Sequence, residues 1–196
     1  MTETLSSDIG ALLQETIGVD VAIIGSSALA NAVKRRQAVS GVPDLAIYEA
    51  RLRALDEELQ ALIDAVVVPE TWFFRDRDAF AAMASLLPRK EARPSRLLSL
   101  PCATGEEPYS MAVTLLAAGF APDRFVIEAV DVCVTYLSPA ARATYGENAF
   151  RGCDPGLREE FFELAAGEYR PVEAVRRQVD RMVSANRPDW DDGLAE

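Results

Sequence analysis

The sequence predicts an α/β protein in which a small N-terminal helical domain precedes the first half of a doubly wound parallel sheet. In the first third of the chain, apolar residues recur at helical spacing. From residue 96 onward, short apolar runs alternate with apolar helical stretches, and this strand–helix–strand–helix order begins a doubly wound sheet. The expected divisions are a helical domain over 1–67, a linker and junction over 68–95, and a partial sheet domain over 96–196.

The helical domain is indicated by two apolar stripes. They consist of Ile9, Leu12, Leu13 and Ile17 in the first, and of Leu45, Tyr48, Leu52, Leu55, Leu59, Leu62 and Ile63 in the second. Between them lie Lys34, Arg35 and Arg36, the only basic residues among the first 50, on an expected helix that ends before Gly41. From the residues alone, this triplet is interpreted as a solvated helix end whose cations complement the C-terminal dipole.

The sheet domain is indicated by three apolar runs. "RLLSL" (96–100) and "RFVIEAVD" (124–131) have the pattern of buried parallel strands, and a third strand is expected in "VDRMVSA" (179–185). Helices are expected between the strands, in "EPYSMAVTLLAAG", which Gly119 closes, and in "SPAARATYG".

Composition excludes several classes of protein. The chain has 196 residues, is 49% hydrophobic, and carries 31 acidic against 20 basic residues. The resulting formal charge of −11 disfavours nonspecific binding to nucleic acid or anionic lipid. Three cysteines without CxxC spacing and the lack of histidine argue against a disulfide framework or a usual zinc site, so no metal is expected. No signal peptide or membrane-spanning run is recognised, which predicts a cytoplasmic protein without membrane insertion.

Residues that carry chemistry are expected where strands end, because ligands of open α/β sheets bind at the carboxyl ends of the strands. The loop after the first strand is "PCATGEE", with Gly105 where the backbone turns closely. The second strand stops at Asp131, whose carboxylate could accept hydrogen bonds from both hydroxyls of a ribose. Glu106 and Glu107 would repel a phosphate at the helix start. A cationic nucleoside, such as S-adenosylmethionine, fits these residues better.

Each of these residues also has a purely structural interpretation. Thr104 and Glu107 have the spacing of a capping box, and an aspartate at a strand end, like Asp131, is often a turn residue. In "ETWFFRD" (70–76), the aromatic residues are typical of core or junction packing. Arg75 is either a structural ion pair or the partner of a carboxylate.

The motifs "TWFFRD", "LLSLPCATGEEPYSMA" and "IEAVDV" follow one another in the order and separation of the CheR family. The chain therefore resembles the S-adenosylmethionine-dependent methyltransferases that esterify glutamate side chains of bacterial chemoreceptors. The resemblance extends weakly over "VKRRQAVSGVPDLAIY" and through "YGENAFRG", and it is strongest to the branch that serves surface-sensing, biofilm-type receptor pathways. It implies a Rossmann-like methyltransferase sheet, S-adenosyl-L-methionine as cofactor, and a role in chemotaxis-type signal transduction.

The resemblance also implies roles for individual residues. The cofactor-binding residues would be Thr71, Arg75, Glu107 and Asp131, and Arg75 would also be the catalytic residue that orients charge near the reacting centre. The substrate-binding residues would be Lys34, Arg35 and Arg36, on a basic helix that faces the cytoplasmic helical region of a methyl-accepting receptor. The cofactor product would be S-adenosyl-L-homocysteine.

The sequence departs from the family pattern in several places. Pro69 stands where many members have asparagine, Cys133 replaces an acid, and "FFELAAGEYRPVEAVRR" is shorter than the loop of members that dock on a receptor tether. The later C-R-N-containing strand motif is absent, so "RLLSL" is expected at an open sheet edge, where self-association could cover it. The alternative function is a truncated, catalytically incompetent receptor-binding module. A nucleotide-binding enzyme of another class is disfavoured by the lack of GxGxxG and GK[ST].

Overall fold

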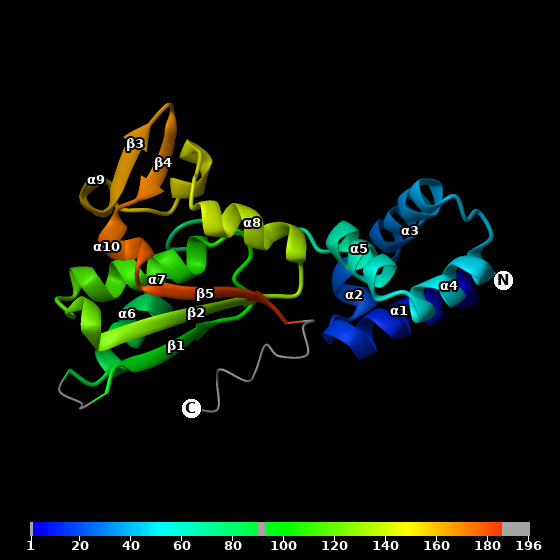
Figure 1. Ribbon diagram of the computed structural model, residues 1–196, viewed down its shortest axis with the longest axis horizontal. Helices are drawn as coiled ribbons and strands as arrows, with labels where there is room; N and C mark the ends of the chain where they lie inside the picture. Colours follow the sequence, from blue (N-terminus) through cyan, green and yellow to red (C-terminus); the bar gives the residue numbers. More distant parts are fainter. Residues whose placement is uncertain (1, 90–92, 186–196) are drawn as a thin grey trace. The chain divides into compact units, whose positions relative to one another are not determined.

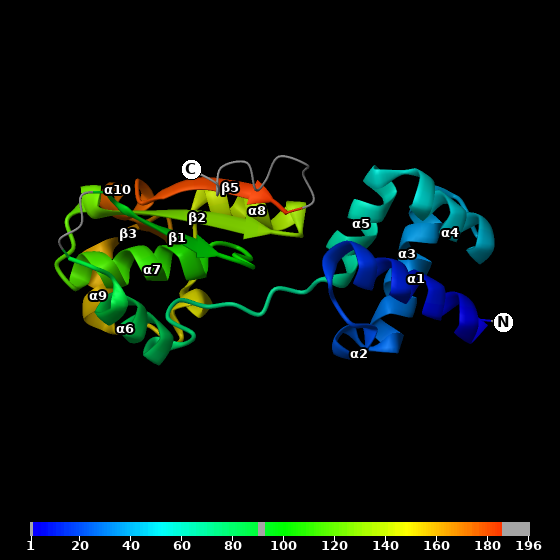
Figure 2. The same cartoon turned by 90° about the horizontal axis from the view of Figure 1, so that it is seen from below.

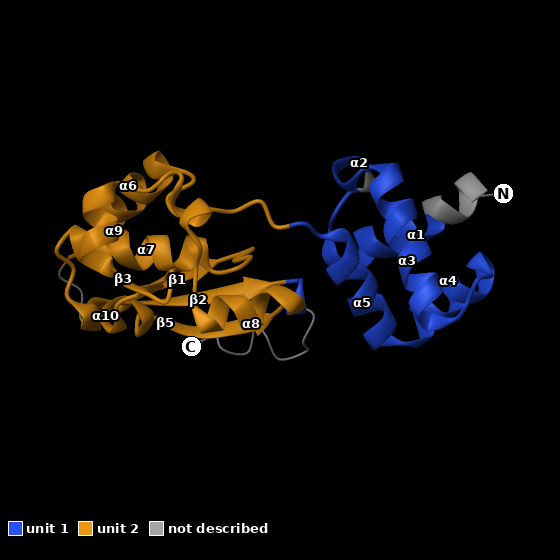
Figure 3. Ribbon diagram, turned by 90° about the horizontal axis from the view of Figure 1, so that it is seen from above, with its two compact units in different colours: residues 1–68, 132–134 blue, residues 69–131, 135–196 orange. Residues whose placement is uncertain are grey.

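The structure of the protein is a computed structural model that describes residues 2–89 and 93–185. It divides into two compact units (Figure 3): unit 1 comprises residues 1–68 and 132–134, and unit 2 comprises residues 69–131 and 135–196. The predicted α/β fold class, with helices first and a parallel sheet second, is confirmed. Residues 186–196, which follow the third predicted strand, lie outside the described residues.

The described part of unit 1 is helical. Its helices are α1 (Thr2–Ile17), α2 (Val21–Ile24), α3 (Ser26–Ser40), α4 (Leu45–Ala54) and α5 (Asp56–Val66) (Figure 1). Their apolar faces meet in a core whose fully buried members include Leu13, Leu29, Leu52 and Leu62. Since burying one such side chain contributes roughly 1.5–3 kcal/mol, this core holds the short helices together.

The second predicted stripe spans two helices rather than one. Leu55 interrupts it with an extended backbone (φ −130°, ψ 103°) and is 45% exposed. The next helix, α5, begins at Asp56, and the acidic residues of its first turn favour a helix N-terminus there. The preceding helix, α4, is begun by Asp44, whose side chain accepts a hydrogen bond from the N–H of Ile47 (3.0 Å).

Unit 2 contains a three-stranded parallel sheet in the order β1-β2-β5 (Figure 1). The strands are β1 (Ser95–Ser99), β2 (Phe125–Asp131) and β5 (Val179–Ser184), which confirms all three predicted strands and their order. Because the strands are parallel, their carboxyl ends lie at one edge of the sheet. Among the described strands, β1 pairs on one side only, as predicted.

Helices and a small hairpin complete unit 2. They are α6 (Arg77–Leu86), α7 (Glu106–Ala117), the 3₁₀ helix η1 (Pro122–Arg124), α8 (Val134–Arg142), the 3₁₀ helix η2 (Glu147–Phe150), α9 (Pro155–Phe161), β3 (Phe162–Ala165), β4 (Glu168–Pro171) and α10 (Glu173–Arg176). The central helix α7 packs against all three strands, and Figure 2 shows α6 and α7 on the same side of the sheet. In the hairpin, Ala166 and Gly167 both have positive φ, as a two-residue type I′ turn requires.

Two segments differ from the sequence-based expectation. The segment 68–95, expected as a linker and junction, belongs to unit 2 from Pro69 onward and contains α6, although residues 90–92 lie outside the described part. The helix expected in "SPAARATYG" begins earlier, at Val134, and ends at Arg142, because Ala143 takes a positive φ of 53°. None of the helices in the described ranges has the length and apolar character needed to cross a membrane.

Candidate functional site

The loop between β1 and α7 lies at the carboxyl end of the sheet and is held by the neighbouring strand. Cys102 N–H donates to the carbonyl of Val130 (2.8 Å), and Gly105 N–H donates to the carbonyl of Cys102 (2.9 Å). Gly105 has a φ of 98°, and a Cβ there would lie 2.7 Å from Tyr145 Oη, whose hydroxyl donates to the carbonyl of Thr104 (3.0 Å). Only glycine fits this backbone, so the predicted close turn is confirmed.

Asp131 is the last residue of β2 and is 2% exposed. Its Oδ2 accepts a hydrogen bond from the N–H of Ala103 (2.7 Å), which has a positive φ of 47°. A buried carboxylate that accepts a backbone N–H is a strong anchor, because the charged form gains from the bond. Asp131 therefore fixes the loop conformation and stands at the strand end where the ligand of an open sheet binds.

The two glutamates at the start of α7 have different surroundings. Glu107 is exposed, and its Oε1 accepts a hydrogen bond from Ser99 Oγ (2.7 Å), whereas Glu106 is 6% exposed and accepts one from Thr104 Oγ1 (2.6 Å). The capping-box interpretation is wrong: α7 begins at Glu106, Gly105 occupies the N-cap position, and no side chain caps the helix. Burial raises the pKa of Glu106, and the hydrogen bond from Thr104 opposes that rise.

The aromatic segment before α6 packs mainly into the core of unit 2. Phe73 is fully buried, stacks on Phe150 (4.7 Å between ring centroids) and meets Phe162 edge-on (4.8 Å), which confirms the core interpretation. Phe74 N–H donates to Ser110 Oγ on α7 (3.0 Å). This bond places the aromatic segment beside the first turns of α7.

Thr71 and Arg75 flank those buried rings and are placed by other contacts. Thr71 is half-buried, while the side chain of Arg75 is 51% exposed and lies 3.7 Å from a carboxylate oxygen of Glu70. The Arg75 guanidinium is 4.8 Å from the centre of the Trp72 ring, and that of Arg151 is 4.0 Å from the same ring. Arg75 therefore forms an exposed ion pair, of a kind that contributes little to stability.

The structure thus brings two of the predicted cofactor residues to one loop. Glu107 is tied to the end of β1 through Ser99, and Asp131 holds Ala103 in the same loop. Sequence reasoning missed Ser99, which is fully buried, and Tyr145, which closes the loop from 41 residues away in sequence. Ser99 could have been recognised from the sequence, because it is a polar residue in the apolar run "RLLSL".

The cysteines of unit 2 do not supply a nucleophile to this loop. Cys102 is fully buried, and burial, together with the nearby carboxylate of Asp131, raises the pKa of its thiol to about 12. Cys153 has its pKa raised to about 11, again mainly by burial. Both thiols are therefore protonated at neutral pH. Within 2–89 and 93–185 no cluster of three or more potential metal ligands occurs.

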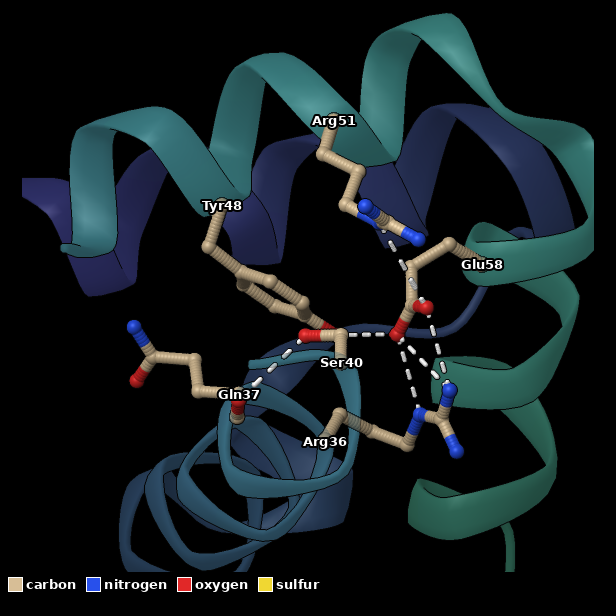
Figure 4. Close-up of polar contacts among 6 residues, drawn as sticks. All are labelled: Arg36, Gln37, Ser40, Tyr48, Arg51 and Glu58. Carbon is tan, nitrogen blue, oxygen red and sulfur yellow. Dashed lines mark hydrogen bonds and ion pairs between the residues drawn. The ribbon is translucent and has the colours of Figure 1, made fainter. Parts of the chain in front are cut away.

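The predicted receptor-facing triplet lies on α3 in unit 1 (Figure 4 shows Arg36 and its neighbours). Lys34 and Arg35 are exposed, while Arg36 donates from Nε and Nη2 to the two carboxylate oxygens of Glu58, both at 3.0 Å. The helix-dipole interpretation of the triplet is wrong, because the last turn of α3 contains no basic residue and the dipole effect is confined to that turn.

A loop with two acidic residues at the carboxyl ends of a parallel sheet, closed by a strand-terminal aspartate, defines a nucleoside-binding α/β domain suited to a positively charged cofactor. Residues 69–191 match the family model described as "CheR methyltransferase, SAM binding domain", and the chain belongs to this family. The cofactor of this domain is S-adenosyl-L-methionine.

Among its relatives are two proteins named "Probable biofilm formation methyltransferase WspC". The one from Pseudomonas putida is 46% identical over 87% of this chain and 42% of its own length, and the one from Pseudomonas aeruginosa is 43% identical over 86% and 41%. A "Chemotaxis protein methyltransferase" from Salmonella typhimurium is 29% identical over 88% of this chain and 60% of its own length. The chain spans about two-fifths of the length of the two Pseudomonas relatives.

Proposed function

We propose that the protein transfers the methyl group of S-adenosyl-L-methionine to glutamate carboxylates of methyl-accepting, chemotaxis-type receptors, giving glutamyl methyl esters and S-adenosyl-L-homocysteine. The observation that carries the proposal is the acidic loop of the matched domain, in which Glu107 is anchored by Ser99 and Asp131 by Ala103. A cytoplasmic role in biofilm-type or chemotaxis-type signalling is part of the same proposal, supported by the names of the relatives.

The chemistry of the donor set fits this cofactor. Glu106, Glu107 and Asp131 surround the start of α7, so the loop favours a cation and disfavours a phosphate. In the proposal, Asp131 accepts hydrogen bonds from the ribose hydroxyls and Glu107 adds a carboxylate to the nucleoside side of the pocket. Thr71 and Arg75 bind the amino-acid end, where the guanidinium exchanges Glu70 for the ligand's carboxylate.

The proposed reaction needs no general base from the protein. Bound S-adenosylmethionine supplies a methyl group that a positively charged sulfur activates. The accepting glutamate has an ordinary pKa of about 4.3, so it is already ionised at neutral pH. The chain, which has no histidine, contributes by holding the accepting carboxylate in line and by excluding water from it. Arg75 is the residue proposed to orient charge at this point.

The proposed protein partner is the cytoplasmic helical region of a receptor, which meets α3 through Lys34, Arg35 and Arg36. The exposure of Lys34 and Arg35 supports the first two assignments. Self-association is a further part of the proposal, because β1 is an edge strand with exposed apolar side chains. Leu98 in the strand is 40% exposed, and Leu100, directly after the strand, is 47% exposed.

The substitution Asp131→Ala tests the cofactor assignment. It is expected to weaken binding of S-adenosyl-L-homocysteine at least tenfold, on the order of 1.5–3 kcal/mol, because charged hydrogen bonds to the ribose are lost. Isothermal calorimetry on the 196-residue chain measures this change. Asp78→Ala, which removes an exposed acid from α6, is the matched control and should leave the affinity unchanged.

Because Asp131 also holds the loop, thermal unfolding of the variant without ligand is measured alongside. A folded Asp131→Ala protein with unchanged affinity would contradict the ribose assignment. A folded wild-type chain that binds a receptor fragment and no S-adenosyl-L-homocysteine would favour the alternative function, a receptor-binding module.

A further inference from the structure

Arg151 belongs to "YGENAFRG", a stretch that packs against the aromatic motif of unit 2. It directly follows the 3₁₀ helix η2 and is exposed. The residue before it, Phe150, stacks on Phe73, and the N–H of Phe73 donates to the carbonyl of Ala149 (2.8 Å). The two stretches are therefore held together, although they are distant in the sequence.

Gly152 fixes the position of Arg151 relative to Trp72. A Cβ at Gly152 would lie 2.8 Å from Cδ1 of Trp72, so the indole packs directly on the backbone that follows Arg151. The Nε of Arg77 donates to the carbonyl of Gly152 (3.0 Å). These contacts exist without a ligand, and an arrangement that is fixed in advance lowers the ordering cost of binding.

Two guanidinium groups lie over the ring of Trp72. That of Arg151 is 4.0 Å from the ring centre, and that of Arg75 is 4.8 Å from it. A guanidinium that stacks on an aromatic ring keeps its N–H donors at its planar edge, where they match the geometry of a carboxylate. The two like charges repel each other, so an anion that contacts both groups is favoured.

The charge of Arg151 is not compensated by a carboxylate of the described residues. Its Nη1 donates to the carbonyl of Asn148 (3.1 Å), and within 2–89 and 93–185 no carboxylate forms an ion pair with it. Arg75, by contrast, pairs with Glu70. Arg151 can therefore receive an anionic group without first losing an ion pair.

The charge of Arg151 also acts on the acidic loop. Burial raises the pKa of Glu106, and the hydrogen bond from Thr104 and the positive charge of Arg151 both oppose that rise. The N–H of Phe74 donates to Ser110 Oγ, whose hydroxyl donates to the carbonyl of Glu106 (2.6 Å). A cation and the acidic start of α7 are thus close enough to interact, which suits an amino-acid group that carries both a carboxylate and an ammonium.

We propose that Arg151 binds the carboxylate at the amino-acid end of S-adenosyl-L-methionine together with Arg75, and that Trp72 holds both guanidinium groups in place. The inference rests on the proposed function, which assigns the amino-acid end of the cofactor to Thr71 and Arg75. It adds a second cation that the resemblance to the family does not supply.

The test is isothermal calorimetry on the 196-residue chain with S-adenosyl-L-homocysteine and with its decarboxylated analogue, which keeps the nucleoside and the ammonium. We expect Arg151→Gln to weaken binding of S-adenosyl-L-homocysteine at least about tenfold and to change binding of the analogue by less than about twofold. Arg151→Lys, which keeps the charge and loses the planar fork of donors, should have an affinity between those of Arg151→Gln and the wild type.

Arg89→Gln is the matched control. Arg89 is also exposed, lies over an aromatic ring (4.6 Å from the centre of the Phe120 ring) and donates to a backbone carbonyl, that of Ala118 (3.1 Å). Ala118 follows the last residue of α7, at the opposite end of this helix from the acidic loop. The control removes the same kinds of contact, and its affinity for S-adenosyl-L-homocysteine should be unchanged.

Thermal unfolding without ligand establishes that the variants are folded. Unchanged affinity of folded Arg151→Gln for S-adenosyl-L-homocysteine would overturn the proposal. An equal loss for both ligands would also overturn it, because an effect that does not need the carboxylate acts through Trp72 or the loop. The wild-type chain gives a check that needs no variant: it should bind the analogue at least about tenfold more weakly than S-adenosyl-L-homocysteine, and equal binding would overturn the proposal.

The assignment of Arg151 and the proposed methyl transfer can fail separately. No receptor is present in the calorimetry, so the carboxylate of an accepting glutamate cannot cause the difference between the two ligands. A chain that binds S-adenosyl-L-homocysteine through Arg151 and methylates no receptor would support the assignment and contradict the proposed activity. A folded wild-type chain that binds neither ligand would overturn both.

Discussion

At the scale of single residues, Glu106 has an unusual environment for a carboxylate. It is 6% exposed at the start of α7, and burial raises its pKa above the ordinary value of a glutamate. The unfolded chain keeps the ordinary pKa, so between the two values the folded state binds the proton more tightly than the unfolded state. The free energy of unfolding therefore falls as the pH rises through the folded-state pKa, and ionised Glu106 lowers stability at neutral pH.

Glu106→Gln is expected to raise the melting temperature at neutral pH. The amide oxygen can still accept the hydrogen bond from Thr104, while the desolvated charge is removed. The gain should shrink on acidification and vanish below the ordinary glutamate pKa, where the wild-type carboxyl is protonated in both states. Thermal unfolding at a series of pH values measures it, with the exposed Glu159→Gln as control. A destabilised variant, or a gain independent of pH, would contradict the assignment.

Single residues of the site could be predicted where the signal was local. Asp131 and Gly105 are predicted from where a strand ends and where a helix must begin. In the structure Asp131 accepts the N–H of Ala103, and Gly105 has no room for a side chain. Tyr145 and Glu58 could not be predicted, because each acts on a residue distant in sequence: Tyr145 on Thr104, 41 residues away, and Glu58 on Arg36, 22 residues away.

At the scale of helices, Glu58 joins three elements of unit 1. It lies in the first turn of α5 and receives hydrogen bonds from Arg36 on α3 and Tyr48 on α4. The three helices are short, so their packing depends on such contacts as well as on the apolar core. Burial and the hydrogen bond to Glu58 raise the pKa of Tyr48, so its hydroxyl remains a donor over the physiological range.

Glu58→Gln is expected to lower the free energy of unfolding by about 3 kcal/mol, because it leaves two arginines beside a neutral amide. This figure is at the low end for a buried pair, since the side chain of Arg36 is 23% exposed and can regain some hydration. Urea unfolding followed by circular dichroism measures the change. Glu49→Gln, which removes an i,i+4 pair with Arg53, is the control and should cost less than about 0.5 kcal/mol. Equal losses for the two variants would contradict the role given to Glu58 in joining the three helices.

Helix and strand types followed from periodicity, but two boundaries did not. The stripe from Leu45 to Ile63 continues past Leu55 with no glycine or proline to mark a break, and only the acidic start of α5 signals it. The helix α6 is not predicted, because the aromatic motif before it indicates a junction between domains. Its start is marked by Asp76, which accepts a hydrogen bond from the N–H of Ala79 (3.2 Å).

At the scale of the whole molecule, the sheet has an edge that invites pairing. Among the described strands β1 pairs with β2 alone, and the apolar side chains of Leu98 and Leu100 are exposed there. Arg96 is the charged residue of this strand, and it forms an ion pair with Glu128 (2.5 Å), which reduces its repulsion of a second copy.

The average mass of the wild-type chain is expected to rise with concentration in sedimentation velocity experiments. Leu98→Lys should suppress that rise, because an extra charge on an edge strand opposes strand pairing. Ile23→Lys, at a residue 82% exposed on α2, is the matched control and should associate like the wild type. Association that persists equally in both variants would place the contact elsewhere than β1.

The close approach of Gly105 and Tyr145 makes the residues allowed at each position depend on the other, although the two lie far apart in the sequence. A side chain at position 105 would meet the Tyr145 hydroxyl at 2.7 Å and Ala140 Cβ at 3.1 Å, and the φ of 98° strains any residue other than glycine, so smaller residues at both positions would not make it acceptable. That double change would also remove the hydroxyl that holds Thr104. The loop would therefore keep this conformation in another sheet only if Ala140 and Tyr145 were transferred with it.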